Sequence, residues 1–132
     1  MRMKIRFAVI DDAAFLRELV KNIVVSEGGI CVGEAANGDE GIAMVQTTLP
    51  DLVFLDMVMP LRNGIETAKA LKELHPEIKI IGCSTIDQEA LVQKAYEAGF
   101  DDYITKPFSK EQIVNSILKV FPHLGESTHG RT

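Results

Sequence analysis

The chain has 132 residues, 46% of them hydrophobic, which suffices for one compact domain with a single core and is too short for two ordinary domains. Its formal net charge of −5 argues against a nucleic-acid partner, because binding to phosphate backbones rests on clustered Lys and Arg side chains, and we expect a protein or small-anion partner instead. No apolar stretch approaches the roughly 20 residues that span a bilayer, and no signal-like segment opens the chain, so we expect a cytoplasmic protein without a membrane partner.

Strand and helix patterns alternate five times along the chain, as in βαβ units. The first apolar run, residues 7–10, leads into a helix that we predict over residues 13–26, where apolar residues recur with the spacing of one buried helical face. Asp12 is the candidate N-cap of this helix, and Gly28-Gly29 ends it.

The later strands and helices are predicted from the same signals, which are apolar runs, N-cap residues and glycines at helix ends. Ser109 and Gln112 have the spacing of a capping box, and Gly99 is a helix stop. The predicted elements are strands over residues 30–34, 52–55, 78–83 and 102–105, and helices that begin near Asn37, Asn63, Asp87 and Ser109.

These elements predict an α/β fold. The runs at residues 7–10 and 52–55 are continuously apolar, which is typical of strands covered by helices on both faces. We therefore predict a doubly wound, five-stranded parallel sheet of the flavodoxin-like (βα)5 kind, with strand order 2-1-3-4-5, in which strands one and three meet where the order reverses. We assign the folded domain to residues 1–121 and a flexible C-terminal tail to residues 122–132.

Four of the predicted strands end on a reactive polar side chain. Asp11 and Asp12 follow the first strand, Asp56 ends the third, Ser84 follows the fourth and Lys106 follows the fifth. Each residue alone has a plain explanation as a helix cap, a loop acid or a surface charge. Parallel strands finish at the same edge of their sheet, however, so these side chains are expected to form one site.

The composition of this site indicates phosphoryl transfer. Crowded carboxylates repel one another and require a cation, and oxygen ligands without a closed cage suit Mg²⁺. A carboxylate can also act as a covalent nucleophile toward phosphorus, in a transition state that needs a fixed cation and hydrogen-bond donors. We predict Asp56 as the nucleophile and Asp11 with Asp12 as the metal anchors. Lys106 is the predicted cation, and Ser84 is the predicted donor.

Together these residues resemble the receiver (response-regulator) family of two-component signalling. The resemblance spans residues 4–121 and includes Asp11-Asp12, residues 56–60, Gly64, Ser84, Ala98-Gly99 and Lys106-Pro107-Phe108. It implies that Asp56 accepts phosphate from the phosphohistidine of a histidine kinase. It also implies that Mg²⁺ is held by Asp11, Asp12, Asp56 and the Val58 carbonyl, that Ser84 and Lys106 contact the phosphoryl oxygens, and that the Lys106–Pro107 bond is cis.

Within the family, residues 11–17, 83–84 and 106–108 look most like stand-alone chemotaxis regulators. This resemblance implies a CheA-like kinase, a target such as a flagellar switch protein or a phosphotransfer protein, and a chain that catalyses only its own phosphorylation and dephosphorylation. We expect a monomer. The resemblance further implies that Ser84 and Tyr103 switch the face formed by the fourth helix, fifth strand and fifth helix, although Tyr103 also fits a half-buried strand aromatic.

Three residues near the predicted phosphorylation site differ from familiar chemotaxis members. Val58 and Ile86 are apolar where polar residues often orient the hydrolytic water, and Thr85 is bulkier than usual. We hypothesise that Val58 and Ile86 exclude or misorient water and so prolong the lifetime of the aspartyl-phosphate. The alternative is that Val58 and Ile86 are merely exposed, as single apolar residues often are.

Two other functions remain as alternatives. The chain fits a phosphorelay intermediate that passes phosphate to a histidine phosphotransfer protein. An aspartate-nucleophile phosphatase of the haloacid-dehalogenase kind fits less well, since it needs a second aspartate at the position of Val58.

Overall fold

The computed structural model describes residues 3–59, 63–85 and 88–124. Strands and helices alternate along these residues in the order β1 (Arg6–Ile10), α1 (Ala14–Ser26), β2 (Ile30–Ala35), α2 (Gly38–Thr48), β3 (Leu52–Asp56), α3 (Gly64–Leu74), β4 (Lys79–Ser84), α4 (Glu89–Ala98), β5 (Asp102–Thr105) and α5 (Lys110–Val120). The strands pair in parallel as one sheet with the order β2-β1-β3-β4-β5, which confirms the predicted doubly wound fold.

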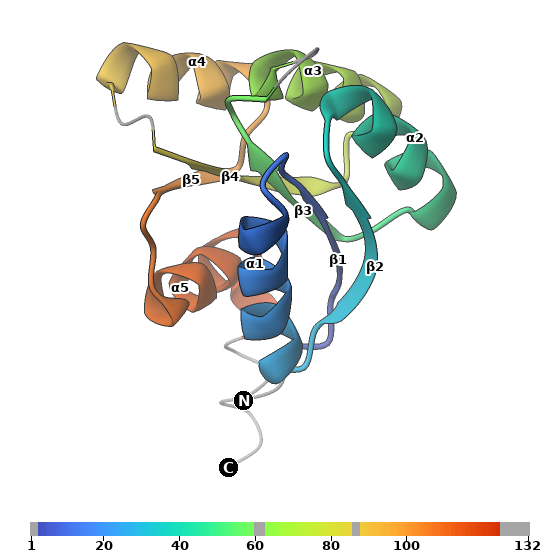
Figure 1. Ribbon diagram of the computed structural model, residues 1–132, viewed down its shortest axis with the longest axis vertical. Coiled ribbons are helices and arrows are strands. Elements are labelled where there is room, and N and C mark those ends of the chain that lie inside the picture. Colours follow the sequence, from blue (N-terminus) through green and yellow to red (C-terminus); the bar gives the residue numbers. More distant parts are fainter. Residues whose placement is uncertain (1–2, 60–62, 86–87, 125–132) are drawn as a thin grey trace.

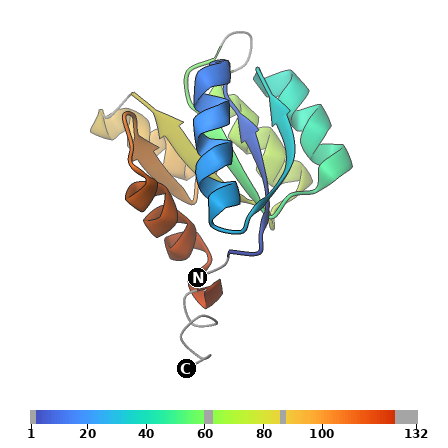
Figure 2. The ribbon, with the colours of Figure 1, turned by 60° about the horizontal axis from the view of Figure 1, so that its bottom comes forward.

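Helices cover both faces of the sheet. Figures 1 and 2 show α1 and α5 on one face and α2, α3 and α4 on the other. Each face packs its own hydrophobic cluster against the sheet, and every residue of β3 is buried between them. Phe7 of β1 and Phe54 of β3 meet edge to face, with ring centroids 6.1 Å apart. The continuously apolar central strands are therefore explained by burial on two sides.

Most predicted helix signals are confirmed, and one cap is wrong. Asn37 caps α2, and Ser109 with Gln112 forms a capping box at α5. The N-cap of α1 is Ala13 and makes no side-chain cap bond, so Asp12 is not the cap. The carboxylate of Asp11 accepts a hydrogen bond from the Ala13 amide at 2.9 Å instead. Asp11, the acid nearer the strand, thus accepts the hydrogen bond of the backbone amide, and Asp12 is exposed.

The chain packs beyond the expected end of the domain. Residues 122–124 form a further helical turn, and Leu124 is buried in the cluster shared with α1 and α5. Residues 122–124, which we assigned to the tail, are thus packed against the domain, and the boundary of the flexible tail stays a prediction. Residues 125–132 lie outside the described part of the chain, as does the predicted cap at Asp87.

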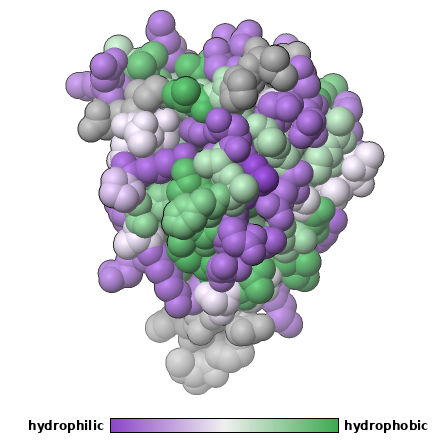
Figure 3. All heavy atoms as spheres, viewed as in Figure 1, coloured by the Kyte–Doolittle hydropathy of each residue, from purple (hydrophilic) through white to green (hydrophobic). Residues whose placement is uncertain are grey.

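The described surface mixes polar and apolar side chains. Figure 3 shows green hydrophobic and purple hydrophilic spheres interspersed on the face seen in Figure 1. Exposed large hydrophobic residues include Phe15, Ile30, Val58 and Tyr96. Among the described residues, no helix has the length and apolar character needed to traverse a lipid bilayer.

Gly64, the first residue of α3, allows this helix to approach the backbone that follows β3. Its amide donates a hydrogen bond to the Met57 carbonyl oxygen at 2.9 Å. A Cβ atom here would overlap the Asp56 carbonyl oxygen and would lie 2.6 Å from the Met57 Cα. Backbone atoms cannot rotate away as a side chain can, so a glycine is required where α3 meets the end of β3.

Replacing Gly64 with Ala is expected to lower the free energy of unfolding by about 2 kcal/mol, because overpacking here outweighs the higher helix propensity of Ala. Gly33→Ala is a matched control, since the atoms nearest to its Cβ would belong to the flexible Met44 side chain, with the Sδ atom 2.6 Å away. Urea denaturation measures both losses. Equal losses in the two variants would show that the close backbone approach at Gly64 carries no cost of its own.

Candidate functional site

The register of the sheet brings the predicted site residues to one edge. Ile10 of β1 is paired with Leu55 of β3, so Asp11 and Asp56 follow at the same level on adjacent strands. On the other side of β3, Asp56 is paired with Cys83 of β4, which places Ser84 one residue further on. The site therefore lies at the carboxyl ends of the strands, where β1 and β3 mark the reversal of strand order.

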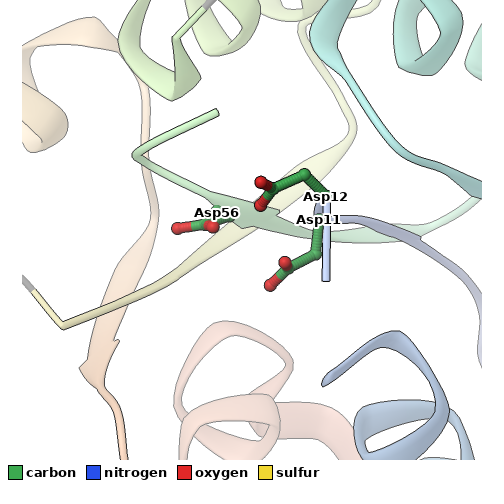
Figure 4. Close-up of side chains that lie close together, drawn as sticks. All are labelled: Asp11, Asp12 and Asp56. Atoms are coloured by element: carbon green, nitrogen blue, oxygen red, sulfur yellow. The ribbon is translucent and has the colours of Figure 1, made fainter. Parts of the chain in front are cut away.

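Three carboxylates converge at this edge. Asp11, Asp12 and Asp56 each offer an oxygen, and these three oxygens all lie within 4.8 Å of one another. Figure 4 shows the three side chains gathered at the carboxyl ends of β1 and β3. Asp11 and Asp56 are only 4% and 6% exposed, whereas Asp12 faces solvent. This set of hard oxygen donors, with one side open to solvent, fits Mg²⁺, which keeps several water ligands.

Lys106 supplies a positive charge among these acids. Its Nζ atom lies 2.9 Å from Asp11 Oδ2 and 3.5 Å from Asp56 Oδ2. The backbone amide of Lys106 donates to the Ser84 carbonyl oxygen at 2.7 Å, which ties the end of β5 to the end of β4. The Lys106–Pro107 bond is cis, as the resemblance implied. Burial lowers the pKa of Lys106, but the hydrogen bond to Asp11 and the charge of Asp56 outweigh it, so the net pKa is raised.

Asp56 is held on both of its carboxylate oxygens. Oδ1 accepts a hydrogen bond from the Val58 amide at 3.2 Å, and Oδ2 faces Lys106. Burial raises the pKa of the Asp56 carboxyl, and the neighbouring charge of Asp11 raises it further, while Lys106 acts in the opposite direction. The ionised form of Asp56 is therefore destabilised by its surroundings. A bound cation would stabilise the negative charge, and phosphorylation would remove it from the carboxylate.

This pKa shift gives the magnesium-free protein a pH-dependent stability. A carboxyl with a raised pKa in the folded state stabilises the fold below its unfolded value and loses that contribution as the pH rises through the folded value. We therefore expect Asp56→Asn to gain stability relative to wild type as the pH rises above 3.8, the ordinary value for this group. Urea denaturation of both proteins in a chelating buffer measures this difference, and a constant difference from acidic to neutral pH would contradict the shift.

The other predicted site residues that the structure describes lie on or just after β3, β4 and β5. Ser84 is buried at the end of β4, and Thr85 next to it is exposed. Val58 is 54% exposed, while Ile86 lies outside the described residues. Tyr103 of β5 is half-buried, with its ring centroid 6.3 Å from that of Phe100. The switching role of Ser84 and Tyr103 stays a prediction, as does the ligand role of the Val58 carbonyl.

One contact of the site was not predicted from the sequence. Arg17 of α1 donates from Nη1 to the backbone carbonyl oxygen of Asp11 at 2.7 Å. Its Nε donates to Glu34 of β2 at 3.3 Å. The sequence placed Arg17 on the first helix but carried no signal for a bond to a backbone carbonyl, since any helical arginine has the same local pattern.

The chain is similar to known proteins over most of its length. A family model described as the response regulator receiver domain matches residues 7–118. The chain is 40% identical over 115 residues to the chemotaxis protein CheY of Thermotoga maritima, covering 87% of this chain and 96% of that protein. It is 43% identical over 112 residues to the chemotaxis protein CheY of Halobacterium salinarum, covering 85% of this chain and 92% of that protein.

Solved structures share the fold. A chain of the CheX–CheY–BeF3–Mg²⁺ complex from Borrelia burgdorferi matches with a TM-score of 0.85 and 26% identity, and the match covers 88% of each chain. The receiver domain of the response regulator NarL from Mycobacterium tuberculosis matches with a TM-score of 0.81 and 29% identity, covering 87% of this chain and 94% of that one.

Proposed function

Because the chain belongs to the response regulator receiver domain family, we propose that it accepts a phosphoryl group on Asp56 from a histidine kinase and relays this signal in chemotaxis. Its CheY relatives support the role in chemotaxis response regulation, and such receivers are signalling proteins rather than metabolic enzymes. The single observation that carries the proposal is the convergence of three carboxylate oxygens within 4.8 Å, one of which belongs to Asp56.

In the proposed reaction, an Asp56 carboxylate oxygen attacks the phosphorus of a phosphohistidine. A phosphorus–oxygen bond to Asp56 forms while the phosphorus–nitrogen bond breaks, and the histidine nitrogen leaves with the bonding pair. Lys106 lies 3.5 Å from Asp56 Oδ2, where its charge stabilises the negative phosphoryl oxygens. Ser84, at the end of the adjacent strand, is the proposed hydrogen-bond donor to the same group.

The residues that would hold Mg²⁺ are Asp11, Asp12, Asp56 and the carbonyl of Val58. When bound there, Mg²⁺ neutralises charge that develops on the transferring phosphoryl oxygens. Asp11 contributes from a fixed position, because its carboxylate also accepts from the Ala13 amide and from Lys106. Asp12 contributes an exposed carboxylate whose presence the fold does not need for capping.

Incubation with acetyl phosphate and Mg²⁺, followed by intact-mass measurement, tests this function. We expect a gain of one phosphate that hydroxylamine removes, because an acyl phosphate reacts with hydroxylamine and a seryl phosphate does not. Absence of a mass gain, or a gain that survives hydroxylamine, would refute an aspartyl-phosphate.

The proposed partners are a CheA-like histidine kinase and a protein target. We propose that the chain meets both partners in the cytoplasm. The target is a flagellar switch protein or a phosphotransfer protein, and the second choice would make the chain a phosphorelay intermediate. The CheX–CheY complex among the solved relatives is a precedent for a protein partner of such a receiver. Binding assays with each target, using phosphorylated and unphosphorylated protein, distinguish the two roles.

The exposed Val58 side chain is proposed to slow hydrolysis of the phosphorylated form. It lies two residues after Asp56 and is 54% exposed, and because it is apolar it offers no hydrogen bond to an approaching water molecule. Val58→Asn is expected to shorten the lifetime of the aspartyl-phosphate several-fold in Mg²⁺ buffer. Val25→Asn is the control, since Val25 is 47% exposed at the far end of α1. Equal lifetimes in wild type and both variants would contradict this role of Val58.

A further inference from the structure

Arg17 links the acidic loop, which is the segment with Asp11 and Asp12 between β1 and α1, to two elements of the scaffold. Its guanidinium donates to the carbonyl oxygen of Asp11 at 2.7 Å and pairs with Glu34 at 3.3 Å. Arg17 lies on α1 and Glu34 on the edge strand β2. The Arg17 side chain is 20% exposed, and its fork of donors holds the loop carbonyl and the strand carboxylate at the same time.

The carbonyl that Arg17 binds belongs to the residue that begins the acidic loop. The amide of Asp11 donates to the Ala35 carbonyl at 3.0 Å, and its carboxylate contacts Lys106. With Arg17 on the carbonyl, the amide, carbonyl and carboxylate of Asp11 are each bonded to a different segment of the chain. The next residue, Asp12, has no side-chain cap role, so the direction of its carboxylate depends on this backbone.

We propose that Arg17 is a positioning residue for magnesium binding, which it supports by fixing the backbone of Asp11 and thereby the direction of Asp11 and Asp12. This inference rests on the proposed function, in which these two acids hold the metal. Groups that orient metal ligands typically contribute about tenfold or more to metal affinity. Glu34 is the second member of the link, because it anchors the other end of the guanidinium.

Electrostatics alone predicts the opposite effect of removing Arg17. A positive charge close to the acidic cluster repels Mg²⁺, so Arg17→Gln should strengthen metal binding if charge were the dominant effect. Positioning predicts weaker binding, because the loop loses its anchor. The sign of the change in the dissociation constant therefore separates the two explanations.

Lys21→Gln is a matched control for Arg17→Gln. Lys21 lies one turn further along α1, also pairs with Glu34, at 3.1 Å, and carries the same charge. Its other partner is Glu18, at 3.0 Å, and not the backbone of Asp11. Both substitutions remove one positive charge and one partner of Glu34, but only Arg17→Gln removes the bond to the acidic loop.

The test is calorimetric titration of Mg²⁺ into wild type, Arg17→Gln, Arg17→Lys and Lys21→Gln. We expect the dissociation constant to rise about tenfold in Arg17→Gln, to rise less in Arg17→Lys, and to stay near the wild-type value in Lys21→Gln. With acetyl phosphate, Arg17→Gln should need more Mg²⁺ for half-maximal labelling but should reach the wild-type rate at saturation. Purely structural damage would lower the saturated rate as well.

Arg17→Gln that binds Mg²⁺ as tightly as Lys21→Gln, or more tightly, would overturn the proposal. If Arg17→Gln does not fold, the comparison of Arg17→Lys with Lys21→Gln decides in the same way. A wild-type protein that binds no Mg²⁺ would instead contradict the proposed function itself. Binding by wild type with no change in Arg17→Gln would remove only the positioning role.

Discussion

Asp56→Asn is expected to reduce phosphoryl incorporation by about a thousandfold or more, since it removes the nucleophile on which the reaction depends. Asparagine has the shape of aspartate but lacks its charge, so the packing around Oδ1 and the Val58 amide is retained. The carboxylate is largely buried and its pKa is raised, so the neutral amide also suits its surroundings. Intact-mass measurement after treatment with acetyl phosphate and Mg²⁺ gives the result directly.

Asp51→Asn is the control for this substitution. Asp51 directly precedes β3, so it lies at the opposite end of the strand that Asp56 ends. Its carboxylate accepts a hydrogen bond from the Arg6 amide at 2.9 Å and takes no part in the acidic cluster. We expect Asp51→Asn to be labelled at the wild-type rate. Labelling of Asp56→Asn at that rate would show that another residue accepts the phosphate.

Lys106→Met is expected to lower the free energy of unfolding by about 3 kcal/mol in a magnesium-free buffer. Removing one partner of a buried ion pair leaves the other charges without compensation, and this usually costs more than the pair itself contributes. The Lys106 side chain is only 11% exposed and contacts both Asp11 and Asp56. Added Mg²⁺ should restore part of the loss, because it supplies positive charge to the same carboxylates.

Lys110→Met is the control, because it shows how much stability is lost when a lysine in an exposed ion pair is replaced. Lys110 forms an ion pair of the same 2.9 Å length with Glu27, but its side chain is 58% exposed. Exposed pairs contribute about 0 to 1 kcal/mol, so we expect little change. Combining Lys106→Met with Asp56→Asn should cost less than Lys106→Met alone, because one uncompensated charge is gone. Equal losses in Lys106→Met and Lys110→Met would contradict the buried ion pair.

The carboxyl ends of the strands were predictable because hydrophobic patterning and parallel topology together fix them. Once β1 and β3 are recognised as buried central strands, Asp11 and Asp56 must lie side by side, and the observed register places them there. The cap of α1 was not predictable in the same way. Asp11 and Asp12 are both able to accept a backbone amide, and only the path of the loop decides that Asp11 does so.

Contacts that depend on the approach of distant backbone segments could not be predicted from the sequence either. The motif placed Gly64 in the family pattern, but the overlap between its absent Cβ and the Asp56 carbonyl follows only from the packing of α3 against the end of β3. Likewise, hydrophobic spacing described α1 without revealing that Arg17 reaches the Asp11 carbonyl. The burial of Leu124 could not be predicted either, because it depends on where α5 packs.

Titration of Mg²⁺ into wild type and Asp12→Asn, without any phosphodonor, tests most directly whether residues 11, 12 and 56 form one metal site. Asp12 is exposed and caps no helix, so its substitution leaves the fold intact and changes the proposed ligand set alone. We predict one saturable site in wild type and clearly weaker binding in Asp12→Asn. No saturable binding in wild type, or the same affinity in both proteins, would contradict the account.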